Sequence, residues 1–184
     1  MGRQWEPMLE HVVRERYQRL LGHALLLCRS TADAQDLVQD ALVSTFGGRA
    51  RFATAAEAEQ YVRRAIVSRF LDESRRRTRE RSVVERSAAR IEHVPEPMPG
   101  IGADVRRALA DLAPRERACV VLRQLDDLSV RETAALLGLS EGAVKRYTSD
   151  GIARVGAALG DVTTHDDVVA VRPTSSTRGV RHDG

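Results

Sequence analysis

Residues 129–154 read SVRETAALLGLSEGAVKRYTSDGIAR, and this stretch predicts two helices joined by a tight turn. Ser129 and Glu132 have the spacing of a capping box, which begins a helix. Gly138 stands where the left-handed end of that helix favours glycine, and Ser140 can then cap a second helix. These positions have the spacing of a DNA-reading helix-turn-helix, although a helical hairpin in any all-α protein would also satisfy them.

The second helix of this pair carries an apolar stripe close to the 3.6-residue period of an α-helix. We expect these side chains to face the core, and they are Val144, Thr148, Ile152, Val155 and Leu159.

The composition favours a helical protein that binds a charged partner. The chain has 184 residues, enough for one domain or two small ones, and only 4% of them are aromatic. Cores must then be built from Leu, Val and Ala, which favours helices over a sandwich or barrel. The net charge is only +3, but the basic residues are mostly clustered arginines, which fits a nucleic-acid binder.

No pattern in the sequence indicates a catalytic, cofactor or metal site. Cys28 and Cys119 lie far apart within apolar helical patterns, so we expect buried free thiols. The five histidines are scattered, and no glycine-rich phosphate loop follows a strand. The polar N-terminus lacks a signal peptide, and the longest apolar run is too short for a membrane span. We therefore expect a cytoplasmic protein that is not an enzyme, uses no cofactor or metal and does not enter membranes.

Two helices are predicted before residue 48. The first begins at Pro7 and runs to about Arg29, with an apolar face of Leu9, Val13, Tyr17, Leu20, Leu21, Ala24 and Cys28. The second begins at Ser30 and ends at Gly47, with an inward stripe of Leu37, Val38, Ala41, Leu42 and Thr45. Its outward face holds Asp33, Asp36, Gln39 and Asp40, which the pattern alone favours as ordinary solvated surface.

A third helix is predicted from about Ala56 to Ser82. We expect its inward residues to be Tyr61, Ala65, Ile66, Phe70 and Leu71. Between Arg63 and Arg81 it carries eight arginines against three acids, a net charge of +5, and we expect all eight to lie off the core. A solvated helix usually mixes charges more evenly. Because arginine pairs with phosphate and stacks on bases, this helix is interpreted as a nucleic-acid surface.

The overall prediction is an all-α fold of two small helical domains joined by a flexible linker. Three prolines and two glycines in the ten residues 93–102 break any helix. We place the first domain at residues 1–82, the linker at 83–102 and the helix-turn-helix domain at 103–160. Residues 161–184 show no helical period and are expected to form a disordered tail.

The two halves together resemble one family. The first half, with DAQDLVQDAL and then YVRRAIVSRFLDESRRR, is similar to the core-binding and −10-reading domain of bacterial sigma factors. The second, with LADLAPRERACVVLRQLDDLSVRETAALLGLSEGAVK, is similar to their −35-reading domain. The lack of an intervening domain matches the extracytoplasmic-function subgroup of the sigma-70 family. The resemblance covers about Tyr17 to Leu159.

The resemblance implies a protein that binds the RNA polymerase core and recognises promoter DNA to direct transcription initiation. The candidate contacts with the β′ clamp helices of the core are Asp33, Asp36, Gln39 and Asp40. The candidate −10 contacts, which lie on a base-receiving loop and the arginine-rich helix, are Ala53, Thr54, Tyr61, Arg64, Ser68, Arg75 and Arg76. The candidate −35 contacts are Ser140, Glu141, Lys145, Arg146 and, toward phosphate, Arg154.

The chain departs from the family pattern at several of these positions. Tyr61 replaces a common Trp and Ser68 a common Asn, so the −10 preference does not transfer. Tyr147 and Asp150 replace common arginines in the recognition helix. Because an acid repels phosphate, we expect Asp150 to pair with an arginine four residues away, either Arg146 or Arg154.

Two other classes of function stay open from the sequence. A helix-turn-helix regulator that binds duplex DNA without polymerase needs only the second half. A module that binds polymerase without reading DNA leaves the basic residues unexplained. The sequence also leaves open whether an anti-sigma factor binds this protein.

Overall fold

The computed structural model describes residues 5–48, 51–81 and 102–163, and within these ranges it contains seven α-helices and no strand. The predicted all-α fold is therefore confirmed. The helices are α1 (Glu6–Leu25), α2 (Thr31–Gly47), α3 (Ala55–Arg81), α4 (Ala103–Ala110), α5 (Pro114–Gln124), α6 (Val130–Leu137) and α7 (Glu141–Thr163). Most of the predicted linker and of the predicted tail lies outside the described residues, and α7 continues three residues past the expected boundary at 160.

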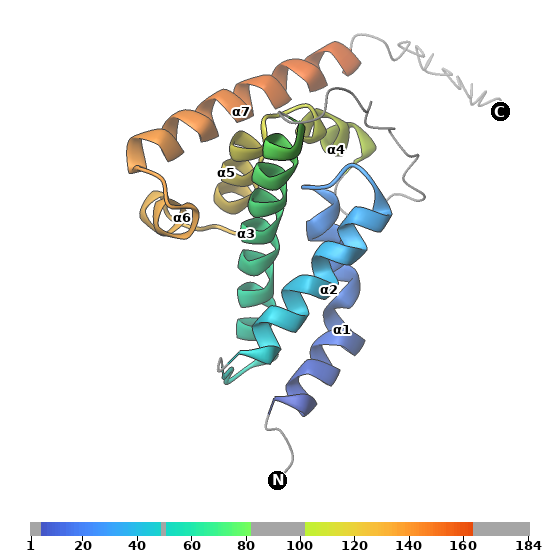
Figure 1. The fold of residues 1–184 in the computed structure, drawn as a ribbon. Helices are drawn as coiled ribbons and strands as arrows, with labels where there is room; N and C mark the ends of the chain where they lie inside the picture. Colours follow the sequence, from blue (N-terminus) through green and yellow to red (C-terminus); the bar gives the residue numbers. More distant parts are fainter. Residues whose placement is uncertain (1–4, 49–50, 82–101, 164–184) are drawn as a thin grey trace, which may run out of the picture.

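The first three helices form one unit, in which α1 and α2 pack along α3 (Figure 1). The hydroxyl of Ser30 caps α2 by accepting a hydrogen bond from the backbone N–H of Asp33 at 3.0 Å. The predicted inward stripe of α2 is confirmed, since all five of its residues are buried. It packs with Phe46 and with Ile66 of α3 in the same core.

The inward faces of α1 and α3 differ in part from the prediction. Val12 is buried on α1, whereas Val13 is 42% exposed. On α3 the buried residues include Val62 and Val67, while Tyr61 is 49% exposed. Apolar residues occur side by side at these positions, as Val12–Val13 and Tyr61–Val62. Helical periodicity alone therefore did not predict which residue of each pair is buried. Helix α1 also ends at Leu25, four residues before the expected end.

Helices α4 to α7 form the second unit, across which the long α7 runs (Figure 1). The capping box is present, because the Ser129 hydroxyl accepts from the N–H of Glu132 and the Glu132 carboxylate accepts from the N–H of Ser129. Gly138 ends α6 with φ +62°, in the left-handed region that favours glycine. Ser140 caps α7 at the N–H of Ala143. The predicted helix-turn-helix is confirmed.

The inward face of α7 includes Gly151 where Ile152 was expected. Gly151 is buried against α5, and a Cβ atom added to it would lie 2.6 Å from the Val120 Cγ2 atom. Ile152 is instead 44% exposed. The absence of a side chain at Gly151 lets the two helices approach closely, which turns the next residue outward.

The two cysteines are free thiols, of which Cys119 is buried in α5 and Cys28 is half-buried after α1. Burial raises the pKa of the Cys119 thiol to about 11. Burial, followed by the nearby charge of Asp33, raises the pKa of Cys28 to about 12. Both thiols are therefore protonated near neutral pH. Among the described residues, no group of His, Cys, Asp and Glu side chains is arranged to hold a metal ion.

The two units share one continuous hydrophobic core rather than standing apart. Helix α3 contacts both α5 and α6, and Arg117 of α5 donates a hydrogen bond to the carbonyl oxygen of Leu27 in the first unit. The prediction of two small domains joined by a flexible linker did not include this direct contact.

Candidate nucleic-acid interface

The N-terminal half of α7 presents the predicted −35 residues to solvent. Lys145 and Arg146 are both exposed. The guanidinium carbon of Arg146 lies 5.1 Å from the centre of the Tyr147 ring, within the range of a cation–π contact. Tyr147 is half-buried against the core, so its position is restricted. Ser140 and Glu141 are exposed at the start of the helix.

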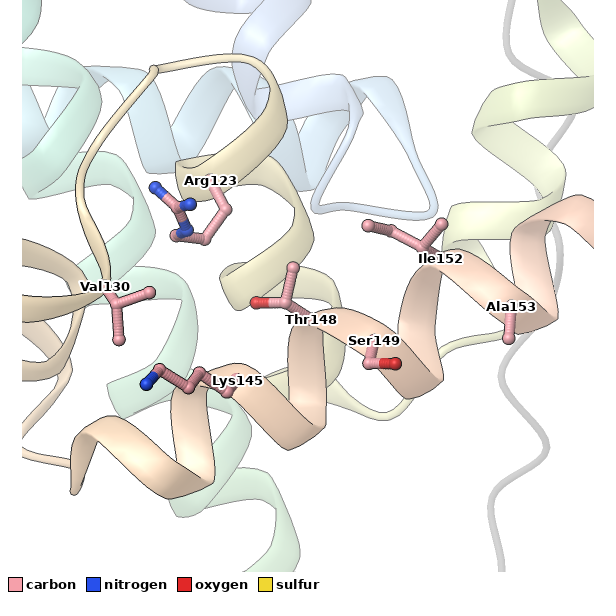
Figure 2. Close-up of a pocket in the computed structure, with 7 residues that line it drawn as sticks. All are labelled: Arg123, Val130, Lys145, Thr148, Ser149, Ile152 and Ala153. Carbon is pink, nitrogen blue, oxygen red and sulfur yellow. The ribbon is translucent and has the colours of Figure 1, made fainter.

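A shallow hollow of about 530 Å³ lies beside these residues, between α7 and the ends of α5 and α6 (Figure 2). Its lining combines two cationic side chains with apolar and small polar ones, namely Arg123, Val130, Lys145, Thr148, Ser149, Ile152 and Ala153. The sequence did not indicate this hollow, because it placed Ile152 in the core.

The prediction that Asp150 pairs with Arg146 or Arg154 was wrong. Arg154 pairs with Glu116 of α5 at 2.7 Å, and Arg146 lies over Tyr147. Asp150 is exposed, and neither arginine pairs with it among the described contacts. Arg154 joins α7 to α5, and its side chain is still 61% exposed.

The loop before α3 is held by a reciprocal pair of hydrogen bonds. The Thr54 hydroxyl accepts from the N–H of Glu57 at 3.1 Å, and the Glu57 carboxylate accepts from the N–H of Ala53 at 2.9 Å. This capping fixes the backbone while Ala53 and Thr54 remain exposed.

A row of three aromatic rings lies next to this loop. The Phe52 ring centre is 5.6 Å from that of Phe46 and 5.3 Å from that of Tyr61. Phe46 is buried, Phe52 is half-buried and Tyr61 is 49% exposed, so the row leads from the core to the surface. The helical pattern alone did not indicate this row, because it placed Tyr61 on the inward face of the helix.

The predicted −10 residues of α3 lie along one side of the helix. Tyr61, Arg64, Ser68 and Arg75 follow each other at intervals of three, four and seven residues, which places them on one face. The positive charge of α3 is partly neutralised, since Arg75 pairs with Asp72 at 3.1 Å and Arg76 with Glu73 at 3.0 Å. The cationic surface is therefore weaker than a charge of +5 suggests.

The acidic residues of α2 differ in exposure and in ion pairing. Asp33 pairs with Arg77 of α3 at 3.2 Å. Asp36, Gln39 and Asp40 are exposed on one face of the helix. Val43 continues this face at the next turn and is 72% exposed. The sequence reasoning missed Val43, although its spacing of three and four residues from Asp40 and Gln39 would have placed it there.

Every helix that the structure describes is too short or too polar to cross a membrane.

Comparisons with known proteins agree across both units. Residues 12–80 match the model of sigma-70 region 2, and residues 103–155 match that of sigma-70 region 4. An RNA polymerase sigma-E factor of Streptomyces avermitilis is 35% identical over 162 residues, covering 82% of this chain and 84% of the relative. The ECF RNA polymerase sigma factor SigM of Mycobacterium tuberculosis is 30% identical over 162 residues, covering 84% of this chain and 79% of the relative.

A solved structure shares the same fold. It is the sigma factor RpoE of Bartonella quintana, in complex with the anti-sigma factor NepR. The similarity has a TM-score of 0.62 at 22% identity, and it covers 82% of this chain and 96% of that one.

Proposed function

Because this chain belongs to the extracytoplasmic-function group of the sigma-70 family, whose members direct transcription initiation by RNA polymerase, we propose that three of its surfaces divide that work. One face of α2 binds the polymerase core, the α3 region reads the −10 element, and α7 reads the −35 element. The observation that carries this assignment is that one chain exposes the cationic start of α7, the arginine-bearing side of α3, and an acidic and apolar face of α2.

For the −35 element, we propose that the start of α7 enters the major groove. Arg146 has the donors to contact guanine O6 and N7, and Glu141 can accept from cytosine N4. The Tyr147 ring supports Arg146 and limits the number of conformations that it must give up on binding. Lys145 is assigned to a base or phosphate contact, Arg154 to a phosphate contact, and Ser140 to the DNA backbone at the start of the helix.

For the −10 element, we propose that a base leaves the stack and is received beside Ala53 and Thr54. Flipping a base costs a few kcal/mol, so the receiving loop must be held in place beforehand. The reciprocal hydrogen bonds of Thr54 and Glu57 supply that rigidity. Tyr61 offers an aromatic face for stacking, and Arg64, Ser68, Arg75 and Arg76 follow the strand along α3.

For the polymerase core, we propose that the face made of Asp36, Gln39, Asp40 and Val43 is the docking surface. Its acids suit a basic partner surface, and the 72% exposed Val43 provides apolar area to bury. Asp33 is assigned to the edge of this surface, because it already pairs with Arg77. The partner is the β′ clamp helices.

The chemistry of transcription belongs to the polymerase, so we propose that this chain is not an enzyme and acts in the cytoplasm, where the polymerase works. The functional units are residues 1–82 and 103–160, with α7 extending to Thr163. An anti-sigma factor is a further candidate partner, because the solved sigma factor that shares this fold is bound to one. A duplex-binding regulator that works without polymerase would give the face of α2 no role.

Run-off transcription tests this proposal. Purified core polymerase is incubated with genomic upstream fragments, with and without this protein. We expect transcripts that begin at fixed sites only when the protein is present, and their upstream sequences give both promoter elements. If the protein instead binds duplex DNA alone and core polymerase gains no new start sites, the regulator is the correct interpretation.

A further inference from the structure

The outward side of α7 carries an acid beside the arginine that we assign to guanine. Val144 and Gly151 are buried and define the side of the helix that packs on the core. Arg146, Ser149 and Asp150 are exposed on the opposite side. At 3.6 residues per turn, Arg146 and Asp150 lie about 40° apart around the helix axis and about 6 Å apart along it. The acid and the arginine therefore belong to one outward surface.

The two arginines with the spacing to neutralise Asp150 have other partners. Arg146 lies four residues before it and Arg154 four residues after it, which is the spacing at which charged side chains pair on a helix. The Arg146 guanidinium lies over the Tyr147 ring, and Arg154 pairs with Glu116 at 2.7 Å. Within the part of the chain that the structure describes, the Asp150 side chain takes part in no ion pair. Its carboxylate is therefore available to a partner outside the chain.

Cations close to this surface make it possible for an acid to approach DNA. Lys145 and Arg146 lie on the same stretch of α7, and Lys145 lines the hollow of Figure 2 together with Arg123 of α5. These cations attract the phosphates that border a groove, so the surface as a whole favours DNA although it presents one acid. Asp150 therefore reduces the general affinity of the surface without abolishing it.

A carboxylate in the major groove distinguishes bases because it accepts hydrogen bonds and donates none. Cytosine presents only its N4 amino group there, which donates, whereas guanine presents two acceptors and thymine presents an acceptor and a methyl group. Adenine presents a donor next to the N7 acceptor, so it satisfies one carboxylate oxygen while N7 repels the other. Every base except cytosine thus leaves a desolvated carboxylate with a poor partner or none, which is costly.

We propose that Asp150 is a base-reading residue of α7 and selects cytosine in the −35 element. The inference rests on the proposed function, which brings the start of α7 into the major groove, and it adds the base that one further position must hold. Asp150 follows Arg146 by about 6 Å, and successive base pairs are about 3.4 Å apart. The selected cytosine therefore lies about one or two base pairs from the guanine that Arg146 contacts.

The test compares the base preferences of Asp150→Asn, Asp150→Ala and the wild-type chain, each bound to core polymerase. The probe is a start-site fragment from the run-off assay with its −35 region randomised, and the bound fragments are separated and sequenced. We expect the wild type to favour cytosine at one position by about fivefold or more. This preference should disappear in Asp150→Ala. In Asp150→Asn it should move to adenine, since an amide can donate to N7 and accept from N6.

Two further variants serve as references. Asp127→Asn removes the same charge from the same unit in the turn between α5 and α6. Asp127 is exposed with φ +53°, a conformation that asparagine tolerates, so the base preferences of this variant should equal those of the wild type. Arg146→Ala should relax the preference at a different position, about one or two base pairs away. Because Asp150 is exposed, its variants should keep the helical circular dichroism signal of the wild type.

Three results would overturn the proposal. If both Asp150 variants bind every sequence more tightly by the same factor, the acid only repels a phosphate. If they change the preference at the position that Arg146→Ala changes, the acid orients that arginine and reads no base of its own. If they leave all preferences unchanged, Asp150 faces solvent in the complex.

A failure of the proposed function gives a different result. If Arg146→Ala relaxes one position and the Asp150 variants relax none, α7 reads the −35 element as proposed and only the role of Asp150 is wrong. If core polymerase gains no start sites in the run-off assay, the proposed function is wrong. The selection is then made with the full chain alone on a pool of random duplexes. The change from cytosine to adenine in Asp150→Asn decides the role of this residue there in the same way.

Discussion

Gly151 of α7 lies so close to Val120 of α5 that a Cβ atom on the glycine would meet the Val120 Cγ2 atom at 2.6 Å. This approach sets the position of the recognition helix on the rest of its unit. It also explains why Ile152 points outward beside the hollow of Figure 2.

Gly151→Ala should therefore destabilise the protein. The added methyl group forces α7 away from α5, and overpacking of this kind costs about 1–3 kcal/mol. Gly156→Ala is the matched control, because a Cβ at Gly156 meets nothing within 4 Å in the same helix. It should stabilise by about 0.5–1 kcal/mol through helix propensity. Thermal unfolding measures both, and equal shifts in the two variants would contradict the close packing.

Tyr147 should act as a positioning residue for Arg146. Tyr147→Phe keeps the ring under the guanidinium and should preserve base preference, whereas Tyr147→Leu removes the π face and should relax preference at one −35 position. The loss should amount to about 0.5–1 kcal/mol, smaller than the 1–3 kcal/mol expected for Arg146→Ala. Binding to duplexes that vary at each −35 base measures it. A uniform loss across all bases would indicate that Tyr147→Leu only disturbs the packing of α7.

The helix-turn-helix could be predicted residue by residue, because its signals are local. A capping box, a left-handed glycine and a serine cap each depend on residues within a few positions, and all three occur as expected. The buried stripe of α2 was equally clear, since its residues recur at the one-, three- and four-residue spacings of one helix face.

The predictions of burial and ion pairing were wrong where they depend on a neighbouring helix. The choices between Val12 and Val13, and between Tyr61 and Val62, depend on which side α1 and α3 turn toward each other. Asp150 does not have its expected partner Arg154, because that arginine pairs with Glu116, which is 38 positions away in the chain. The burial of Asp126 between His23 and Arg63 joins residues more than sixty positions apart, which no periodic pattern reports.

The α2 face should be required for binding to the polymerase core. Changing both Asp36 and Asp40 to Arg reverses the charge of this face, and truncating Val43 to Ala removes its exposed apolar group. We expect the double variant to bind core at least about tenfold more weakly and Val43→Ala to have a smaller effect. Competition with the wild-type chain for core polymerase measures both. The control changes Glu10 and Glu15 of α1, which are exposed acids on another helix, to Arg. An equal loss in this control would indicate a general effect of net charge.

The two thiols should react slowly in the folded protein. Thiolate is the reactive species, and raising a thiol pKa from 9.0 to about 12 lowers its thiolate fraction near neutral pH by about a thousandfold. Cys119, whose pKa is raised to about 11, is also shielded sterically because it is buried in α5. We expect alkylation by iodoacetamide at pH 8 to be much slower at both sites than in urea, where the pKa values return to normal. Mass spectrometry of peptides separates the two sites. Native rates equal to the unfolded rates would mean that the helices around these residues open far more often than their packing implies.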